Sequence, residues 1–243
     1  MLAIEDTDYS RFLADLGRSI RPKAAVVFTA HWESEKTALT YTDGVYETIH
    51  DFGGFPDALY AMRYPAKGSV ATAEEVERRL TGKGIEVRRD PARGLDHGTW
   101  TLLSRLYPEA DIPVVQVSVH PYWPAETQYR IGEALRGLGD DGILVIGSGV
   151  TVHNLRLIRW QASEPERWAA EFDDWLIDQV SRGDREALFE YERLAPHAKA
   201  AVPRPEHFVP FLIAYGSGNP AAKPKVIYRG YEYGTLSYLC CQF

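Results

Sequence analysis

Cysteine is scarce in this 243-residue chain, which contains only the adjacent pair Cys240 and Cys241. Two neighbouring cysteines cannot brace a domain with disulfides, and such sparing use of cysteine is typical of a reduced, cytoplasmic setting. No apolar run approaches the roughly 20 residues that a membrane-spanning helix requires. The opening stretch, MLAIEDTDYS, lacks both the basic region and the long apolar region of a signal peptide. We therefore expect a cytoplasmic protein with no membrane partner.

Positive charge is also in deficit, because 27 lysine and arginine residues face 34 acidic ones and the formal net charge is -7. Without a stripe of basic residues, the chain lacks the electrostatic surface of proteins that bind nucleic acid or anionic membranes. Nucleotide-binding signatures are missing as well, since there is neither a G-x-G-x-x-G after a strand nor a Walker A lysine. The stretch VIGSGV is no nucleophile elbow, because Ile146 stands where the first glycine is required. We expect no nucleic-acid partner.

The chain does contain a regular alternation of strand and helix patterns. The expected strands cover residues 24–29, 38–41, 84–87, 113–119, 142–147, 226–228 and 237–240, and the expected helices cover 9–20, 71–82, 100–106, 126–138 and 168–182. The apolar run GILVIG at 142–147 is expected to be a buried strand. This alternation indicates an α/β fold with a central, mostly parallel or mixed sheet flanked by helices on both faces. No linker divides the chain, so we predict a single domain over residues 1–243.

Five of the seven histidines stand where strands or turns end. His31, His120 and His153 each follow a predicted strand, whereas His97 and His207 lie in loops that lead into helices. Ligands of open α/β sheets bind beyond the carboxyl ends of the strands, so these side chains can converge on one cleft. A single histidine of this kind is more often structural, but His31, His153 and His207 together offer a mononuclear metal site. Imidazole ligands suit iron, zinc and copper.

The other polar candidates have simpler interpretations. His50 and His197 stand in polar contexts, and we expect both to be solvated. Asp96 and Glu206, each next to a histidine, can act as ligands or can orient the imidazoles of partners further away. The aromatic loop at 52–60 most often forms part of a core, although such a loop can also wall a pocket for a flat ring.

Seven short motifs span nearly the whole chain in order: TAHWES at 29–34, DFGGFP at 51–56, YPAKG at 64–68, LDHGTW at 95–100, SVHP at 118–121, GSGVTVHNL at 147–155 and PEHFVP at 205–210. Any one of them is a weak signal. Together, in this order, they resemble the class III extradiol ring-cleaving dioxygenases. The nearest branch is the DOPA 4,5-dioxygenase type, within the superfamily of the protocatechuate 4,5-dioxygenase beta subunit.

The resemblance implies a non-haem Fe(II) enzyme that uses O2 to open a catechol ring, DOPA-like or related, to a semialdehyde. It implies His31 and His207 as metal ligands, and His153 as a further ligand or as an acid/base residue. His97 would be a catalytic group that transfers protons or orients the substrate, and His120 is a weaker candidate for the substrate-binding wall. Zn(II) can also occupy such an iron site. The implied partners are therefore a small-molecule catechol and O2.

The chain departs from this resemblance in two places. Members of the family begin with a short strand and an H-G-x-P loop whose histidine binds the metal, whereas this sequence starts at Met1 and opens with a helix. Either the start is set too late, or the chain lacks that strand and one ligand, in which case His153 would complete a three-histidine site. The second departure is Val202-Pro203, where many relatives have His-Pro, and it concerns a substrate contact.

Two other functions are compatible with the same fold and the same histidines. A zinc-dependent hydrolase would use a metal-bound water of lowered pKa as its nucleophile. A non-catalytic metal-binding relative would keep the fold after losing turnover. Such a protein has no need to keep His97 and His153, so their presence favours the dioxygenase.

Overall fold

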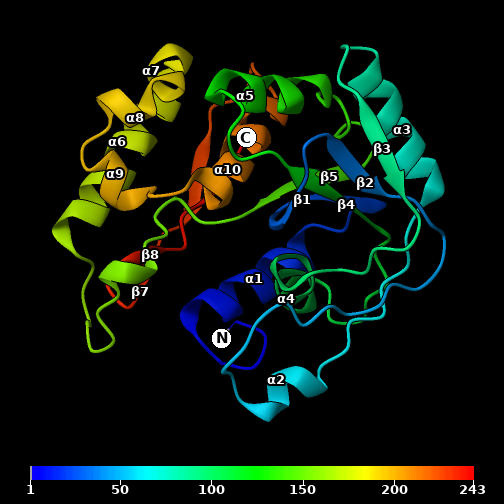
Figure 1. The fold of residues 1–243 in the computed structure, drawn as a ribbon, viewed down its shortest axis with the longest axis horizontal. Coiled ribbons are helices and arrows are strands. Elements are labelled where there is room, and N and C mark those ends of the chain that lie inside the picture. Colours follow the sequence, from blue (N-terminus) through cyan, green and yellow to red (C-terminus); the bar gives the residue numbers. More distant parts are fainter. Residues whose placement is uncertain (1) are drawn as a thin grey trace.

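The computed structural model describes residues 2–243, and a five-stranded sheet lies at the centre of the molecule (Figure 1). Its strands are β1 (Ala24–Glu33), β2 (Thr37–Thr40), β3 (Val87–Asp90), β4 (Val114–Val119) and β5 (Ile143–Ser148). The spatial order is β3-β2-β4-β1-β5. β1 pairs in parallel with β4 and β5, β2 pairs in parallel with β3, and β2 and β4 run antiparallel. The fold is therefore α/β with a mixed sheet, which confirms the prediction.

Helices cover both faces of this sheet, and Figure 1 shows α1 and α4 on the opposite side from α5 and α10. Their bounds are α1 (Asp8–Ser19), α3 (Val70–Thr81), α4 (His97–Leu106), α5 (Ala125–Ala134) and α10 (Val209–Ser217). On β1, Ala25 and Val27 pack on the α1 and α4 side, whereas Val26 and Phe28 pack against α3, α5 and α10. Alternate side chains of one apolar strand thus support two helical layers. Within residues 2–243, no helix combines the length and apolar character that a membrane crossing requires.

Three of these helices begin at polar residues that cap them. Thr7, Ser69 and Asp96 precede α1, α3 and α4, and the side-chain oxygen of each accepts the backbone N–H three residues further on. Such a cap satisfies an amide that the helix geometry leaves without a partner, and it stabilises a helix by about 1 kcal/mol. The Asp96 cap bears directly on the site, because its helix starts at His97.

A third buried cluster lies beside the sheet, where α6 to α9 pack around Phe172, Leu176 and Phe208. These helices are α6 (Arg167–Arg182), α7 (Arg185–Phe189), α8 (Tyr191–Leu194) and α9 (Ala198–Ala201). The remaining elements are α2 (Asp57–Ala61), the 3-10 helices η1 (Leu155–Leu157) and η2 (Pro205–His207), and the strands β6 (Lys225–Tyr228), β7 (Tyr231–Glu232), β8 (Leu236–Ser237) and β9 (Cys240–Gln242). Because Phe208 directly follows η2, this cluster holds the segment that carries His207.

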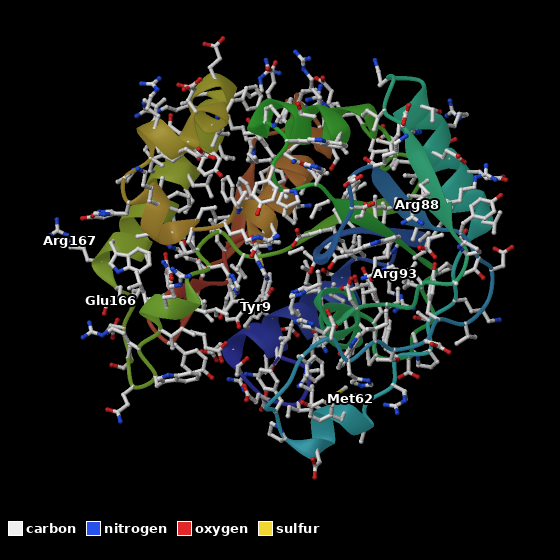
Figure 2. The ribbon with its side chains drawn as sticks, in the orientation of Figure 1. Tyr9, Met62, Arg88, Arg93, Glu166 and Arg167 are labelled. Carbon is white, nitrogen blue, oxygen red and sulfur yellow. The ribbon has the colours of Figure 1, made fainter. Side chains whose placement is uncertain are left out.

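β5 differs from the expected buried strand. All of its residues, Ile143–Ser148, are half-buried, whereas β4 is buried along its whole length. The cause is position, because within residues 2–243 β5 forms one edge of the sheet and pairs with β1 alone. The opposite edge, β3, begins at Val87 rather than at residue 84 and carries Arg88, which Figure 2 labels, and Arg89. Charged side chains discourage pairing with a further strand, so the β3 edge is protected by its arginines, whereas the β5 edge is an apolar strand.

Candidate metal centre

Four imidazole rings lie in a row near the carboxyl ends of β1 and β5. The ring centroids of His97 and His31 are 3.8 Å apart, those of His31 and His207 are 5.0 Å apart, and those of His207 and His153 are 3.7 Å apart. All four side chains are half-buried. The sequence predicted that these histidines converge, and they do, as expected for side chains at strand exits. We call this set the histidine row.

The first two imidazoles are positioned by contacts between β1 and the start of α4. The Thr29 hydroxyl donates to a carboxylate oxygen of Asp96 at 2.8 Å, and the backbone N–H of His31 donates to the Thr29 hydroxyl oxygen at 3.2 Å. Asp96 is fully buried and caps α4, so it ties the helix that begins at His97 to the strand that carries His31. A side chain at Gly98 would meet the His31 ring, since its Cβ would lie 2.7 Å from Cδ2. Asp96 is therefore a positioning residue.

The other two imidazoles are positioned by the loop after β5 and by η2. The backbone N–H of Val150 donates to the carbonyl oxygen of His207 at 2.9 Å, and the N–H of His153 donates to the carbonyl oxygen of Ala201 at 2.9 Å. Gly149 permits this approach, because a Cβ there would lie 2.1 Å from the His207 carbonyl oxygen. The glycines flanking the site thus have a steric role, in addition to any turn that they form.

An aspartate that the sequence analysis did not single out lies beside the first pair. Asp51 Oδ1 is 3.0 Å from Nδ1 of His97 and accepts the backbone N–H of His97 at 2.9 Å. Its other oxygen is 3.7 Å from Nδ1 of His31. Asp51 is the only acidic residue of the DFGGFP motif, and this position in a motif is the sequence feature that could have identified it. We call His31, Asp51 and His97 the Asp51 half.

A buried glutamate lies beside the second pair. Glu206 is 8% exposed, and its Oε1 is 3.0 Å from Nδ1 of His207 in a hydrogen bond. With the proton on Nδ1, His207 donates to Glu206 and its Nε2 lone pair is free to bind a ligand. This arrangement gives Glu206 the orienting role that the sequence allowed, on its own neighbour rather than on a distant one. We call His153, Glu206 and His207 the Glu206 half.

The protonation states suit a ligand set. Burial, together with the neighbouring imidazoles of His97 and His207, lowers the pKa of His31 to about 3. Burial, together with the neighbouring imidazole of His207, lowers the pKa of His153 to about 4. Burial acts to raise the pKa of Asp51, but its hydrogen bonds with His97 outweigh this effect and lower the pKa to about 2. Near neutral pH, the imidazoles of His31 and His153 are uncharged and can donate a nitrogen lone pair to a metal, and Asp51 is an ionised carboxylate.

These residues fit a metal ion. Each half offers three ligand atoms that lie within 4.8 Å of one another. Imidazole nitrogen and carboxylate oxygen are donors that suit Fe(II) and Zn(II). The expected ligand set of His31, His153 and His207 draws one residue from the Asp51 half and two from the Glu206 half.

The remaining histidines lie outside the row. His120 stacks on Trp123 with centroids 4.6 Å apart, and it follows β4, the strand next to β1. His50 was expected to be solvated, but it is half-buried against Trp100 and its Nε2 is 3.2 Å from the carbonyl oxygen of Met62, a residue labelled in Figure 2. The expectation for His50 is therefore wrong, because the aromatic loop folds over it. His197 is exposed, as expected.

Known proteins resemble this chain in sequence and in fold. The family described as the catalytic LigB subunit of aromatic ring-opening dioxygenase matches residues 7–240. The chain is 39% identical to the 4,5-DOPA dioxygenase extradiol of Beta vulgaris, over 98% of this chain and 90% of that protein. It is 36% identical to the 4,5-DOPA dioxygenase extradiol of Escherichia coli (strain K12), over 100% of this chain and 90% of that protein. It also resembles the crystal structure of an uncharacterised protein from Escherichia coli K12, with a TM-score of 0.83 and 32% identity over 98% of this chain and 93% of that chain.

Proposed function

Because this chain belongs to the family of the catalytic LigB subunit of aromatic ring-opening dioxygenases, we propose that its histidine row binds Fe(II) and serves the cleavage of a catechol. The chain is an extradiol aromatic ring-opening dioxygenase, an oxidoreductase with a metal cofactor, and it acts on a small molecule and O2. The finer proposal is that the substrate is a DOPA-like catechol and that the product is a semialdehyde. The observation that carries it is a row of four imidazoles with a carboxylate beside each pair.

His31, His153 and His207 are the proposed metal ligands. The rings of His31 and His207 are adjacent in the row, and His153 stacks on His207. With three protein ligands, a bound metal would remain able to take up the substrate and O2. Bound Fe(II) would supply the electronic coupling between the substrate and O2. The contribution of the chain is to hold these groups in place and to exclude stray water from a half-buried site.

His97 is the proposed acid/base residue. A catechol must lose protons when its oxygens bind a metal, and histidine can accept a proton near neutral pH. Asp51 stands 3.0 Å from Nδ1 of His97 and is ionised there. A carboxylate at this distance stabilises the imidazolium that forms when His97 takes the proton. The same proton is then available for return to the reacting oxygens. His153, if it does not bind the metal, is the alternative for this role.

An aromatic wall beside His97 supports a flat aromatic substrate. The Phe52 ring lies edge-on to His97 with centroids 5.4 Å apart, and it contacts Tyr60 at 5.1 Å and Phe55 at 5.6 Å. Rings packed in this way favour further aromatic contacts. His120, at the exit of the strand next to β1, is the proposed second contact for the substrate. The names of these relatives, 4,5-DOPA dioxygenase extradiol, make DOPA the first compound to test.

We propose one catalytic domain for residues 1–243 and a cytoplasmic setting. The family match runs through residues 7–240 without a break, which supports one domain. Cys240 and Cys241 are free thiols, which is compatible with a reducing compartment.

The test is turnover with a defined metal. The purified protein is loaded anaerobically with Fe(II) and mixed with L-DOPA, simple catechols or a monophenol, while O2 consumption and the yellow absorbance of a semialdehyde are recorded together. We expect equal molar consumption of O2 and catechol, and no reaction with the monophenol. The Zn(II)-loaded protein is the control and should bind catechol without consuming O2. If the Fe(II) protein binds metal but consumes no O2 with any catechol, the proposed chemistry is wrong and hydrolase substrates become the next test.

A further inference from the structure

One guanidinium group joins three strand and helix ends around the histidine row. Arg204, just before η2, forms a two-pronged ion pair with Glu33, the last residue of β1, with Nη1 2.7 Å from Oε1. Its Nε donates to the Tyr122 hydroxyl at 3.1 Å. Its Nη1 also lies 3.4 Å from Oε2 of Glu206. Glu33 ends β1, the strand that carries His31, and Glu206 lies in η2 beside His207. Tyr122 follows β4 and stands two residues after His120.

Glu206 lies between this guanidinium and the His207 imidazole. Its Oε1 is engaged by Nδ1 of His207, but its buried Oε2 has no hydrogen-bond partner within residues 2–243. Among the described residues, that oxygen forms an ion pair with Arg204, whose Nη1 is 3.4 Å away. A buried carboxylate oxygen without a donor is costly unless a nearby charge offsets it. The Arg204 guanidinium therefore faces the oxygen of Glu206 that His207 does not engage, and this contact helps to hold the carboxylate turned toward His207.

We propose that Arg204 is a positioning residue for the metal centre: it holds Glu206 on Nδ1 of His207 and fixes the exit of β1 against η2. The inference rests on the proposed function, because it concerns the imidazole that we assign to the metal. A group that hydrogen-bonds the second ring nitrogen of a ligating histidine, as Glu206 does, sets the tautomer and direction of that imidazole. Its loss typically costs about 10- to 100-fold in metal affinity. Arg204 reaches the ligand through Glu206, and it also braces the strand that carries His31.

Two substitutions and one control test this role. Arg204→Gln removes the charge, and Arg204→Lys keeps the charge but loses the planar fork. Arg11→Gln is the matched control, because Arg11 also bridges two carboxylates, Asp6 and Asp8, and is similarly exposed at 56% against 44% for Arg204. Thermal unfolding of all three metal-free variants shows whether any of them has lost its fold.

The first readout is the His207 imidazole of the metal-free protein, followed by ¹⁵N NMR. In the wild type we expect a single tautomer with the proton on Nδ1. Arg204→Gln should give a mixture of tautomers, whereas Arg204→Lys and Arg11→Gln should resemble the wild type. An unchanged His207 spectrum in Arg204→Gln would overturn the proposal. This readout needs neither metal nor substrate, so it is independent of whether the protein cleaves catechols.

The second readout is the affinity for Co(II), a spectroscopic substitute for Fe(II), measured by competition with a chelator. We expect about tenfold weaker binding for Arg204→Gln, a smaller loss for Arg204→Lys and no change for Arg11→Gln. Equal Co(II) affinity in all variants, with a wild type that does bind Co(II), would also overturn the proposal. A wild type that binds no Co(II) would instead contradict the metal centre itself, and the NMR comparison would still decide the role of Arg204.

Discussion

His31 and His97 lie beside Asp51, whereas His153 and His207 lie beside Glu206, so each half of the row combines two imidazoles with one carboxylate. The two carboxylates are held differently. Asp51 comes from a loop, is exposed, and contacts an imidazole on each side. Glu206 is buried, is next to its histidine in sequence, and makes one hydrogen bond to it.

This difference between the two carboxylates suits the two halves to different roles. A buried carboxylate fixed on one imidazole nitrogen is suited to holding a ligand in one orientation. An exposed carboxylate close to two imidazoles is suited to stabilising a proton that arrives on one of them. We therefore expect the Glu206 half to control metal affinity and the Asp51 half to control proton transfer, with His31 serving both.

The largest effect should come from removing an imidazole from each half in turn. We expect His207→Gln to abolish tight metal binding and turnover together. His97→Gln should keep the metal but lower kcat by about 10²- to 10⁴-fold, the usual contribution of an acid/base group. Metal content by atomic absorption and kcat by O2 uptake separate the two outcomes. If His97→Gln loses the metal as completely as His207→Gln, the division between the halves is wrong.

Neutralising the carboxylates should give the next largest effect. Glu206→Gln is expected to weaken metal binding by about 10- to 100-fold. Asp51→Asn should leave metal affinity close to the wild type and lower kcat instead, because His97 loses the charge that stabilises its imidazolium. Chelator competition gives the affinity and initial O2 uptake gives kcat. The comparison fails if Asp51→Asn weakens the metal more than Glu206→Gln does.

The glycines that allow close approach test the two halves through stability. Gly98→Ala would place a methyl group 2.7 Å from the His31 ring, and Gly149→Ala would place one 2.1 Å from the His207 carbonyl oxygen. Each should lower the free energy of unfolding by about 1–3 kcal/mol, the usual range for overpacking. Gly149→Ala should cost more, because its neighbour is backbone and cannot rotate away. Gly53→Ala, with no atom within 4 Å of its Cβ, is the control for urea denaturation.

A further effect is the acid sensitivity of the metal-free protein. The pKa of His31 falls from 6.5 to about 3 on folding and that of His153 to about 4, so the unfolded chain binds more protons between these values. Stability is then fully present above pH 6.5 and falls as the pH drops below it, by at most about 1.4 kcal/mol per pH unit for each histidine. Asp51, whose pKa is lowered to about 2, adds to the loss only below about pH 4. Urea denaturation at a series of pH values from 7.5 to 4.5 measures the free energy of unfolding. This free energy should fall less steeply with decreasing pH in His31→Gln than in the wild type.

The sequence predicted the sheet and a convergence of five histidines, four of which form the row, because apolar periodicity and strand-end positions are local signals. His120, the fifth, lies outside the row and stacks on Trp123. It did not predict that β5 is half-buried, since an apolar run reads the same at the centre and at the edge of a sheet. The short helices α7 to α9 were missed because pieces of four or five residues carry little periodicity. Asp51 was missed for a different reason: its meaning depends on tertiary contacts with His31 and His97 that no local pattern encodes.

X-ray absorption at the iron edge of the anaerobic Fe(II)-loaded protein tests the central claim most directly. The account predicts the multiple-scattering signature of three imidazoles, reduced to two in His153→Gln and unchanged in His97→Gln. An iron spectrum with oxygen ligands only, or one that loses an imidazole in His97→Gln but not in His153→Gln, would contradict the assignment of the two halves.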